Sequence, residues 1–169
     1  ERSGLSLPTA WRRRLPLAEA VARWAPLASS AFRIAVVLGE EIPDRLNRYV
    51  RQHADAVCPA IVEVCTAHIV DEARHIAYAR ELLEQRVPAL SRARRTLLRP
   101  LLQQLLQQFV RTFYYPRAAL YELAGLYPGA HWARLAWTNP ERTRFVQQCV
   151  APTTAMLAQR GLPVIWRRE

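Results

Sequence analysis

The pattern of apolar and polar residues along the chain is that of α-helices. Long stretches place apolar residues with a period of about 3.6, while alternating apolar and polar runs are short. No Asn-Gly or Asp-Gly pair marks a hairpin, and the 169 residues include only five glycines. We therefore predict an all-α fold, with residues 1–169 forming a single helical domain.

The periodic stretches predict five principal helices and one shorter helix near the start. The principal helices are expected over residues 31–52, 59–86, 92–115, 116–127 and 140–160, and the shorter one over 15–27. Ser29-Ser30 and Asn139 are placed to cap helix N-termini, the helix over 92–115 follows Ser91, and Gly161 is placed to end the last helix. Prolines inside three of the helices predict interruptions, namely a kink or bulge at Pro43, an interruption at Pro100 and a break at Pro152.

The composition narrows the class of protein. The net charge of +10 comes from 24 arginines and no lysine, but the arginines are scattered, which favours solvated helix faces over a nucleic-acid-binding surface. No apolar run of about 18 residues predicts a membrane span. The three cysteines form no CxxC pair, which indicates unpaired thiols and a cytoplasmic protein. The chain also lacks an initiator Met, so we expect it to be part of a longer protein or a processed one.

One predicted helix carries metal-ligand side chains on an otherwise apolar stripe. His68, Glu72 and His75 follow one another at helical spacing, and the same side carries Cys65 and Ala79. Buried carboxylates and imidazoles need a binding partner, and a metal ion can be that partner for all of them. A set rich in carboxylate with few imidazoles suits iron or manganese better than zinc. Glu-x-x-His alone is weak evidence, because a surface Glu beside a satisfied His gives the same pattern.

A second helix offers a carboxylate on its apolar face. Glu41 shares that face with Ile34 and Val37, so Glu41 is the predicted ligand and its neighbour Glu40 the second choice. The alternative is an acidic turn that pairs with arginines at helical spacing. Asp71 is placed to orient a metal-bound imidazole by a hydrogen bond, without binding the metal itself.

These residues resemble the second half of the site in ferritin-like di-iron N-oxygenases, the family typified by p-aminobenzoate N-oxygenase. The resemblance lies in "GEEIPDRLNRYV" and "HIVDEARHI", with a second His one turn before Glu-x-x-His, and is specific over residues 30–80. It implies a ferritin-like bundle in which two irons activate dioxygen and oxidise an arylamine, with electrons from a donor. It also implies that Glu41, His68, Glu72 and His75 bind the metal, with Asp71 and Arg74 supporting them.

The resemblance covers only half of the expected ligands. Such sites use a Glu from each of two helices and a Glu-x-x-His from each of two others, and nothing before Glu40 supplies the second set. The chain is therefore expected to be the C-terminal portion of a longer oxygenase, to pair with another polypeptide, or to form a homodimer with a shared site. Two other functions stay open: a ferroxidase or metal-binding protein, and a metal-free helical interaction domain.

Overall fold

The computed structural model describes residues 30–168. Within this range the chain forms helices and no strand, which confirms the predicted all-α class. The elements are α2 (Ser30–Gln52), the short 3-10 turn η2 (Ala54–Ala56), α3 (Pro59–Arg86), α4 (Arg92–Tyr114), α5 (Ala118–Leu123), α6 (Gly129–Thr138) and α7 (Pro140–Gln159). The helix predicted over residues 15–27 lies outside the described residues.

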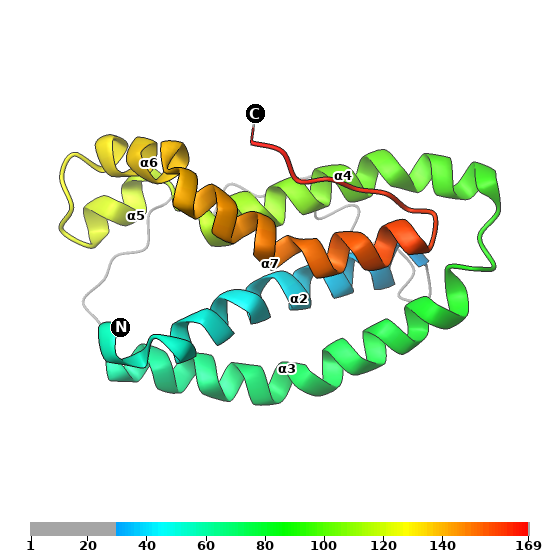
Figure 1. Ribbon diagram of the computed structural model, residues 1–169, viewed down its shortest axis with the longest axis horizontal. Helices are drawn as coiled ribbons and strands as arrows, with labels where there is room; N and C mark the ends of the chain where they lie inside the picture. The colour runs from blue at the N-terminus through cyan, green and yellow to red at the C-terminus, as the bar shows by residue number, and fades with distance from the viewer. Residues whose placement is uncertain (1–29, 169) are drawn as a thin grey trace.

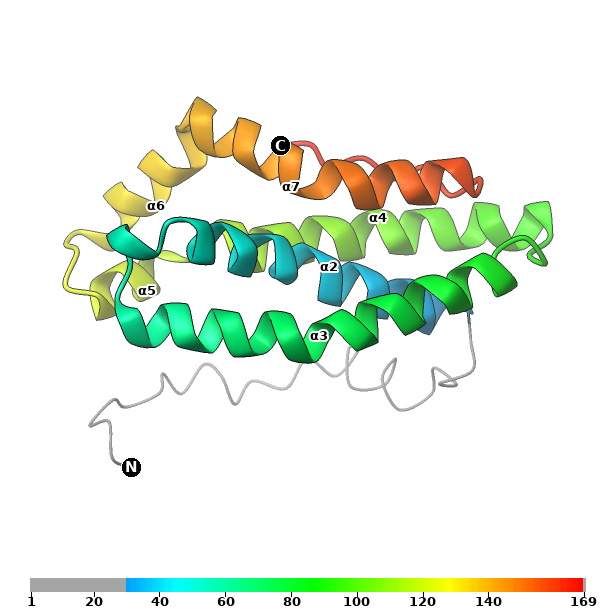
Figure 2. The same cartoon turned by 60° about the horizontal axis from the view of Figure 1, so that its bottom comes forward.

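Four long helices form a bundle in which α2 is central. α2 packs against α3 on one side and against α4 and α7 on the other (Figures 1 and 2). The short helices α5 and α6 pack on each other at one end of the bundle. α3 lies at an edge, and the long helix beside it is α2.

The core lies between α2, α4 and α7. Its fully buried side chains recur every three or four residues on each helix and include Ile34, Val37, Leu38 and Ile42 of α2, Leu102, Leu106 and Val110 of α4, and Val146 and Leu157 of α7. Burial of each such side chain contributes about 1.5–3 kcal/mol, so this three-helix contact accounts for much of the stability of the fold.

The C-terminal segment completes the core without forming a helix. Leu162, Val164 and Trp166 are buried in alternation, and the segment runs back along α4 (Figure 1). The backbone N–H of Ile165 donates to the side chain of Gln103, whose amide in turn donates to the Ile165 carbonyl.

The predicted cap at Asn139 is confirmed, and Ser91 caps α4 in the same way. The Ser91 hydroxyl accepts from the backbone N–H of Arg94, and the Asn139 side chain accepts from two N–H groups at the start of α7. Gly161 follows the last residues of α7 with φ of +75°, a conformation that glycine adopts without strain.

The prediction of a break at Pro152 is wrong, because α7 continues through it. Pro43 and Pro100 also lie inside continuous helices. Each proline removes one helical N–H donor, and the cost is offset by burial of the neighbouring turns in the core. The helix predicted from 116 is shorter than expected, and α6 was not predicted. α6 packs on α5 so closely that a Cβ on Gly129 would lie 2.2 Å from the Ala118 carbonyl oxygen.

The three cysteines are unpaired, as predicted; Cys65 and Cys149 are buried and Cys58 is exposed. None of the helices in the described part of the chain combines the length and the apolar character that a bilayer crossing requires.

Candidate metal centre

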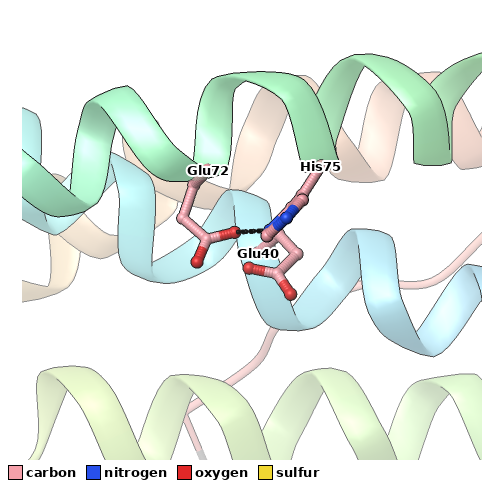
Figure 3. Close-up of side chains that lie close together, drawn as sticks. All are labelled: Glu40, Glu72 and His75. Atoms are coloured by element: carbon pink, nitrogen blue, oxygen red, sulfur yellow. Dashed lines mark hydrogen bonds and ion pairs between the residues drawn. The ribbon is translucent and has the colours of Figure 1, made fainter.

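Glu40 of α2 and Glu72 and His75 of α3 converge on one point. Each offers a ligand atom, and these atoms all lie within 4.8 Å of one another. Figure 3 shows Glu72 and His75 projecting from α3 beside Glu40, with Nδ1 of His75 2.9 Å from Oε2 of Glu72. Within residues 30–168 this is the one such group of three ligand-type side chains.

The local sequence explains the convergence. Glu72 and His75 lie three residues apart, so one turn of α3 presents both to the same side. A short connection folds α3 back along α2, which brings residue 40 next to residue 72. Two helices that pack along their length hold the three side chains together without any loop.

The two carboxylates of the cluster influence each other strongly. The side chain of Glu72 is only 12% exposed. Burial, together with the neighbouring Glu72 carboxylate, raises the pKa of Glu40 to about 7. The pKa of Glu72 is lowered, first by its hydrogen bond with Glu40 and then by its hydrogen bond with His75. Two acids this close in a poorly solvated place share a proton, and a bound cation would take that proton's place. The donor set of two carboxylates and one imidazole therefore fits iron.

His68 lies beside the cluster, one turn earlier on α3. Its Nδ1 is 3.6 Å from Oε1 of Glu72, and its side chain is about half exposed. It faces the carboxylate from the side opposite His75, so Glu72 has an imidazole near each oxygen.

The structure does not bring Glu41 to this group. Glu41 is 2% exposed and lies in the core side of α2. Nε of Arg80 donates to one of its oxygens at 2.5 Å, and the Thr153 hydroxyl of α7 donates to the other at 2.5 Å. Successive residues on a helix differ by about 100° in direction, so Glu40 and Glu41 cannot both face the cluster. Glu40, the second choice in the sequence, is the carboxylate that lies with Glu72 and His75.

The expected supporting residues are also placed differently. Asp71 and Arg74 are exposed, and neither forms an ion pair with another described residue. Arg80 instead makes the ion pair with a buried carboxylate that was expected of Arg74. Sequence reasoning missed Arg80 and Thr153, because their partner Glu41 lies 39 and 112 residues away and no local spacing signals the contact.

An apolar groove adjoins the cluster. It has a volume of about 260 Å³ and lies between α2 and α3. Most of its walls are apolar, and Arg33, Glu40 and His75 are the polar side chains that line it. The apolar lining consists of Phe32 and Val36 from α2 and Tyr78, Ala79 and Leu82 from α3. The groove is thus open to an apolar group that approaches the ligand atoms.

A helical bundle with paired carboxylates and imidazoles on facing helices is the architecture of ferritin-like di-iron proteins. Comparison with protein families makes this specific: the family described as p-aminobenzoate N-oxygenase AurF matches residues 2–161. The chain belongs to this family of di-iron N-oxygenases, and the predicted resemblance and ferritin-like fold are confirmed.

Similar proteins occur in mycobacteria. Uncharacterised proteins of Mycobacterium bovis and of two Mycobacterium tuberculosis strains, CDC 1551 / Oshkosh and H37Rv, are each 37% identical to this chain over 89 residues. The match spans 53% of this chain and 25% of each relative, so the chain aligns with about a quarter of their length. No solved structure matches the chain.

Proposed function

We propose that this chain carries ligands of a di-iron site that uses dioxygen to oxidise the nitrogen of an arylamine to the hydroxylamine and nitro levels. Family membership supports the reaction class, and the convergence of Glu40, Glu72 and His75 carries the assignment to these residues. The electrons for dioxygen reduction would come from a separate donor.

Bound iron would supply the reduction of dioxygen and the transfer of oxygen to nitrogen. The chain's own residues would bind the iron and shape the path by which the substrate reaches it. Glu72 has two oxygens flanked by imidazoles, so it is placed to chelate or to bridge, while His75 and Glu40 each offer a terminal ligand atom. His68 would be the additional imidazole, since its Nδ1 lies 3.6 Å from Oε1 of Glu72.

The apolar groove gives the substrate a place beside these ligands. We infer that the aromatic ring would bind beside Tyr78 and Val36, with its amine toward Glu40 and His75, because all four line the groove. The apolar part of the lining would limit water near the reacting nitrogen, which favours transfer of oxygen to the substrate over release of reduced oxygen species.

The central test is a count of bound metal in the full chain. The protein is loaded anaerobically with Fe(II), desalted, and analysed for iron and manganese by elemental analysis. We expect iron in the wild-type chain and loss of most of it in Glu40→Gln and in Glu72→Gln. Glu41→Gln is the matched control, because Glu41 is adjacent in sequence but paired with Arg80 and Thr153.

The controls decide between the two carboxylates. Circular dichroism shows whether each variant remains folded. If Glu41→Gln loses iron while folded and Glu40→Gln retains it, Glu41 is the ligand and the assignment of Glu40 is wrong. A folded wild-type chain that binds no iron or manganese would leave a metal-free helical interaction domain instead.

Oxygen consumption separates an oxygenase from a ferroxidase. An oxygenase consumes more dioxygen per iron when an arylamine such as p-aminobenzoate is added, and forms the N-oxidised product. A ferroxidase consumes the same amount with or without the amine.

A further inference from the structure

A second hollow between α2 and α3 is lined mainly by charged side chains. It has a volume of about 280 Å³ and shares no lining residue with the apolar groove. Glu41, Ala73 and Ile76 line it, and each directly follows a residue of the ligand cluster in the sequence. Because successive helical residues differ by about 100° in direction, the hollow lies on a different side of these two adjacent helices (Figure 2). We call it the arginine pocket, and its charged residues are Glu41, Asp44, Arg45, Arg48 and Arg80.

Two of the arginines are held in place by buried acids. Nε of Arg48 donates to Oδ2 of Asp44 at 2.7 Å, and Nε of Arg80 donates to Oε1 of Glu41 at 2.5 Å. Asp44 and Glu41 are only 6% and 2% exposed, so they anchor these guanidinium groups from inside the bundle. The other N–H groups of Arg48 and Arg80, and all those of Arg45, donate to no other residue in the described part of the chain. Guanidinium groups oriented in this way are suited to bind an oxyanion.

Asp44 leaves one acceptor without a donor. Its Oδ1 is buried, and no residue within 30–168 donates to it. A buried carboxylate oxygen without a donor is unfavourable, so the pocket favours an occupant that brings an O–H or N–H group to Oδ1. Glu41 has no such need, because its two oxygens accept from Arg80 and Thr153. A water molecule could donate to Asp44 but would bring no negative charge to the arginines.

These two requirements define the chemistry of the occupant. The arginine pocket has three positive and two negative side chains, which favours an anion. The anion also has to keep a hydroxyl group for Oδ1 of Asp44. Hydrogen phosphate meets both requirements at neutral pH. Sulfate has only acceptor oxygens, so it would direct an oxygen at the Asp44 carboxylate.

We propose that the arginine pocket binds phosphate as hydrogen phosphate, with Asp44 accepting the hydrogen bond from its hydroxyl group. Arg45, Arg48 and Arg80 pair with the anionic oxygens, so the bound phosphate joins α2 and α3. This site goes beyond the proposed function and needs no iron, so the two are tested independently.

The test is isothermal titration calorimetry of the full, metal-free chain at pH 8 with phosphate, sulfate and methyl phosphate. Sodium chloride at about 150 mM screens non-specific attraction to exposed arginines. Inorganic phosphate keeps a hydroxyl group at this pH, whereas a phosphate monoester, with its second pKa of about 6, has lost its own. We expect phosphate to bind at least about tenfold more tightly than either other anion, because these present only acceptor oxygens to Asp44.

Two substitutions separate the role of the acid from that of the arginines. Asp44→Asn keeps an acceptor for Arg48 and adds an N–H donor, so sulfate should bind about tenfold more tightly and the preference for phosphate should disappear. Arg45→Gln should weaken phosphate binding about tenfold, and it leaves both buried acids with their partners.

Arg51→Gln is the matched control for Arg45→Gln. Arg51 is on the same helix, does not line the arginine pocket, and its replacement changes the net charge of the chain equally. Phosphate binding by this variant should stay within about twofold of the wild type. Circular dichroism checks that every variant keeps the helical content of the wild type.

Other outcomes would contradict the proposal. Equal affinity of the wild type for phosphate and sulfate, or for phosphate and methyl phosphate, shows that the hydroxyl group is not recognised. Phosphate binding that persists in folded Arg45→Gln, or falls equally in Arg51→Gln, shows a dependence on general positive charge. A wild-type chain that binds none of the anions leaves water as the partner of Asp44. Each of these results leaves the iron content of the chain, and with it the proposed function, unaffected.

Discussion

Glu40 and Glu41 have adjacent positions and opposite surroundings. Glu41 is saturated by two donors in the core, where a buried carboxylate must be paired. Burial, together with the neighbouring Glu72 carboxylate, raises the pKa of Glu40 to about 7. The first arrangement stabilises the fold, whereas the second is unfavourable until a proton or cation is bound. At the scale of the residue, this contrast is the main reason to assign metal binding to Glu40.

The raised pKa of Glu40 predicts a pH dependence of stability. Because its pKa of about 7 in the folded chain exceeds the ordinary value of 4.5, the folded state binds the extra proton, and stability from this group falls as pH rises from about 4.5 to 7. Glu40→Gln removes the ionisation and should raise the melting temperature of the metal-free chain at pH 8. Thermal melts with chelator at pH 5 and pH 8 check this: the difference between variant and wild type should be larger at pH 8.

At the scale of the element, one hydrogen bond connects helices that are distant in the chain. Thr153 of α7 donates to Glu41 of α2, and Arg80 of α3 pairs with the other oxygen of the same carboxylate. Three helices are therefore joined through one buried side chain. Directional contacts of this kind fix the relative rotation of helices, which apolar contacts alone specify less well.

Removal of this hydroxyl should destabilise the bundle. Thr153→Val keeps the shape but leaves an oxygen of buried Glu41 without its donor, so the free energy of unfolding should fall by about 1–3 kcal/mol. Urea denaturation followed by circular dichroism measures the change. Thr154→Val is the control, since the Thr154 hydroxyl bonds only to the Ala151 carbonyl of its own helix. Equal stability of both variants would contradict the role given to Thr153.

At the scale of the whole molecule, the bundle divides into a well-packed part and an open part. α2, α4 and α7 bury the core residues, while α3 covers α2 and leaves much of its own length exposed. The ligand cluster lies at the border between the two parts. Metal bound there would therefore hold α3 against α2 at the ligand cluster.

Metal binding should consequently stabilise the whole fold. A ligand that binds only the folded state adds RT ln(1 + [L]/Kd), about 2.7 kcal/mol at 100 times Kd. We expect Fe(II) under anaerobic conditions to raise the melting temperature of the wild-type chain, and a chelator to reverse the rise. The Glu72→Gln variant should show little response. A melting temperature that stays constant across the chelator titration would argue against a metal site.

The sequence by itself determined the helices and the place of Glu72 and His75 on one turn of α3. Periodicity and caps placed α3 at its observed bounds and located the starts of α4 and α7, because these signals act within a few residues. The spacing of Glu72 and His75 placed both on one turn for the same reason. Local patterns did not predict the passage of α7 through Pro152, where burial outweighs the loss of one hydrogen bond.

Only the tertiary structure decided between Glu40 and Glu41. Glu41 is buried in the core, where Arg80 and Thr153 arrive from other helices to pair with it, while Glu40 is only partly buried. The tertiary structure also leaves one side of α3 exposed beside Glu72 and His75. Helix rotation and neighbour choice are set by the packing of distant segments, which no spacing within one helix encodes.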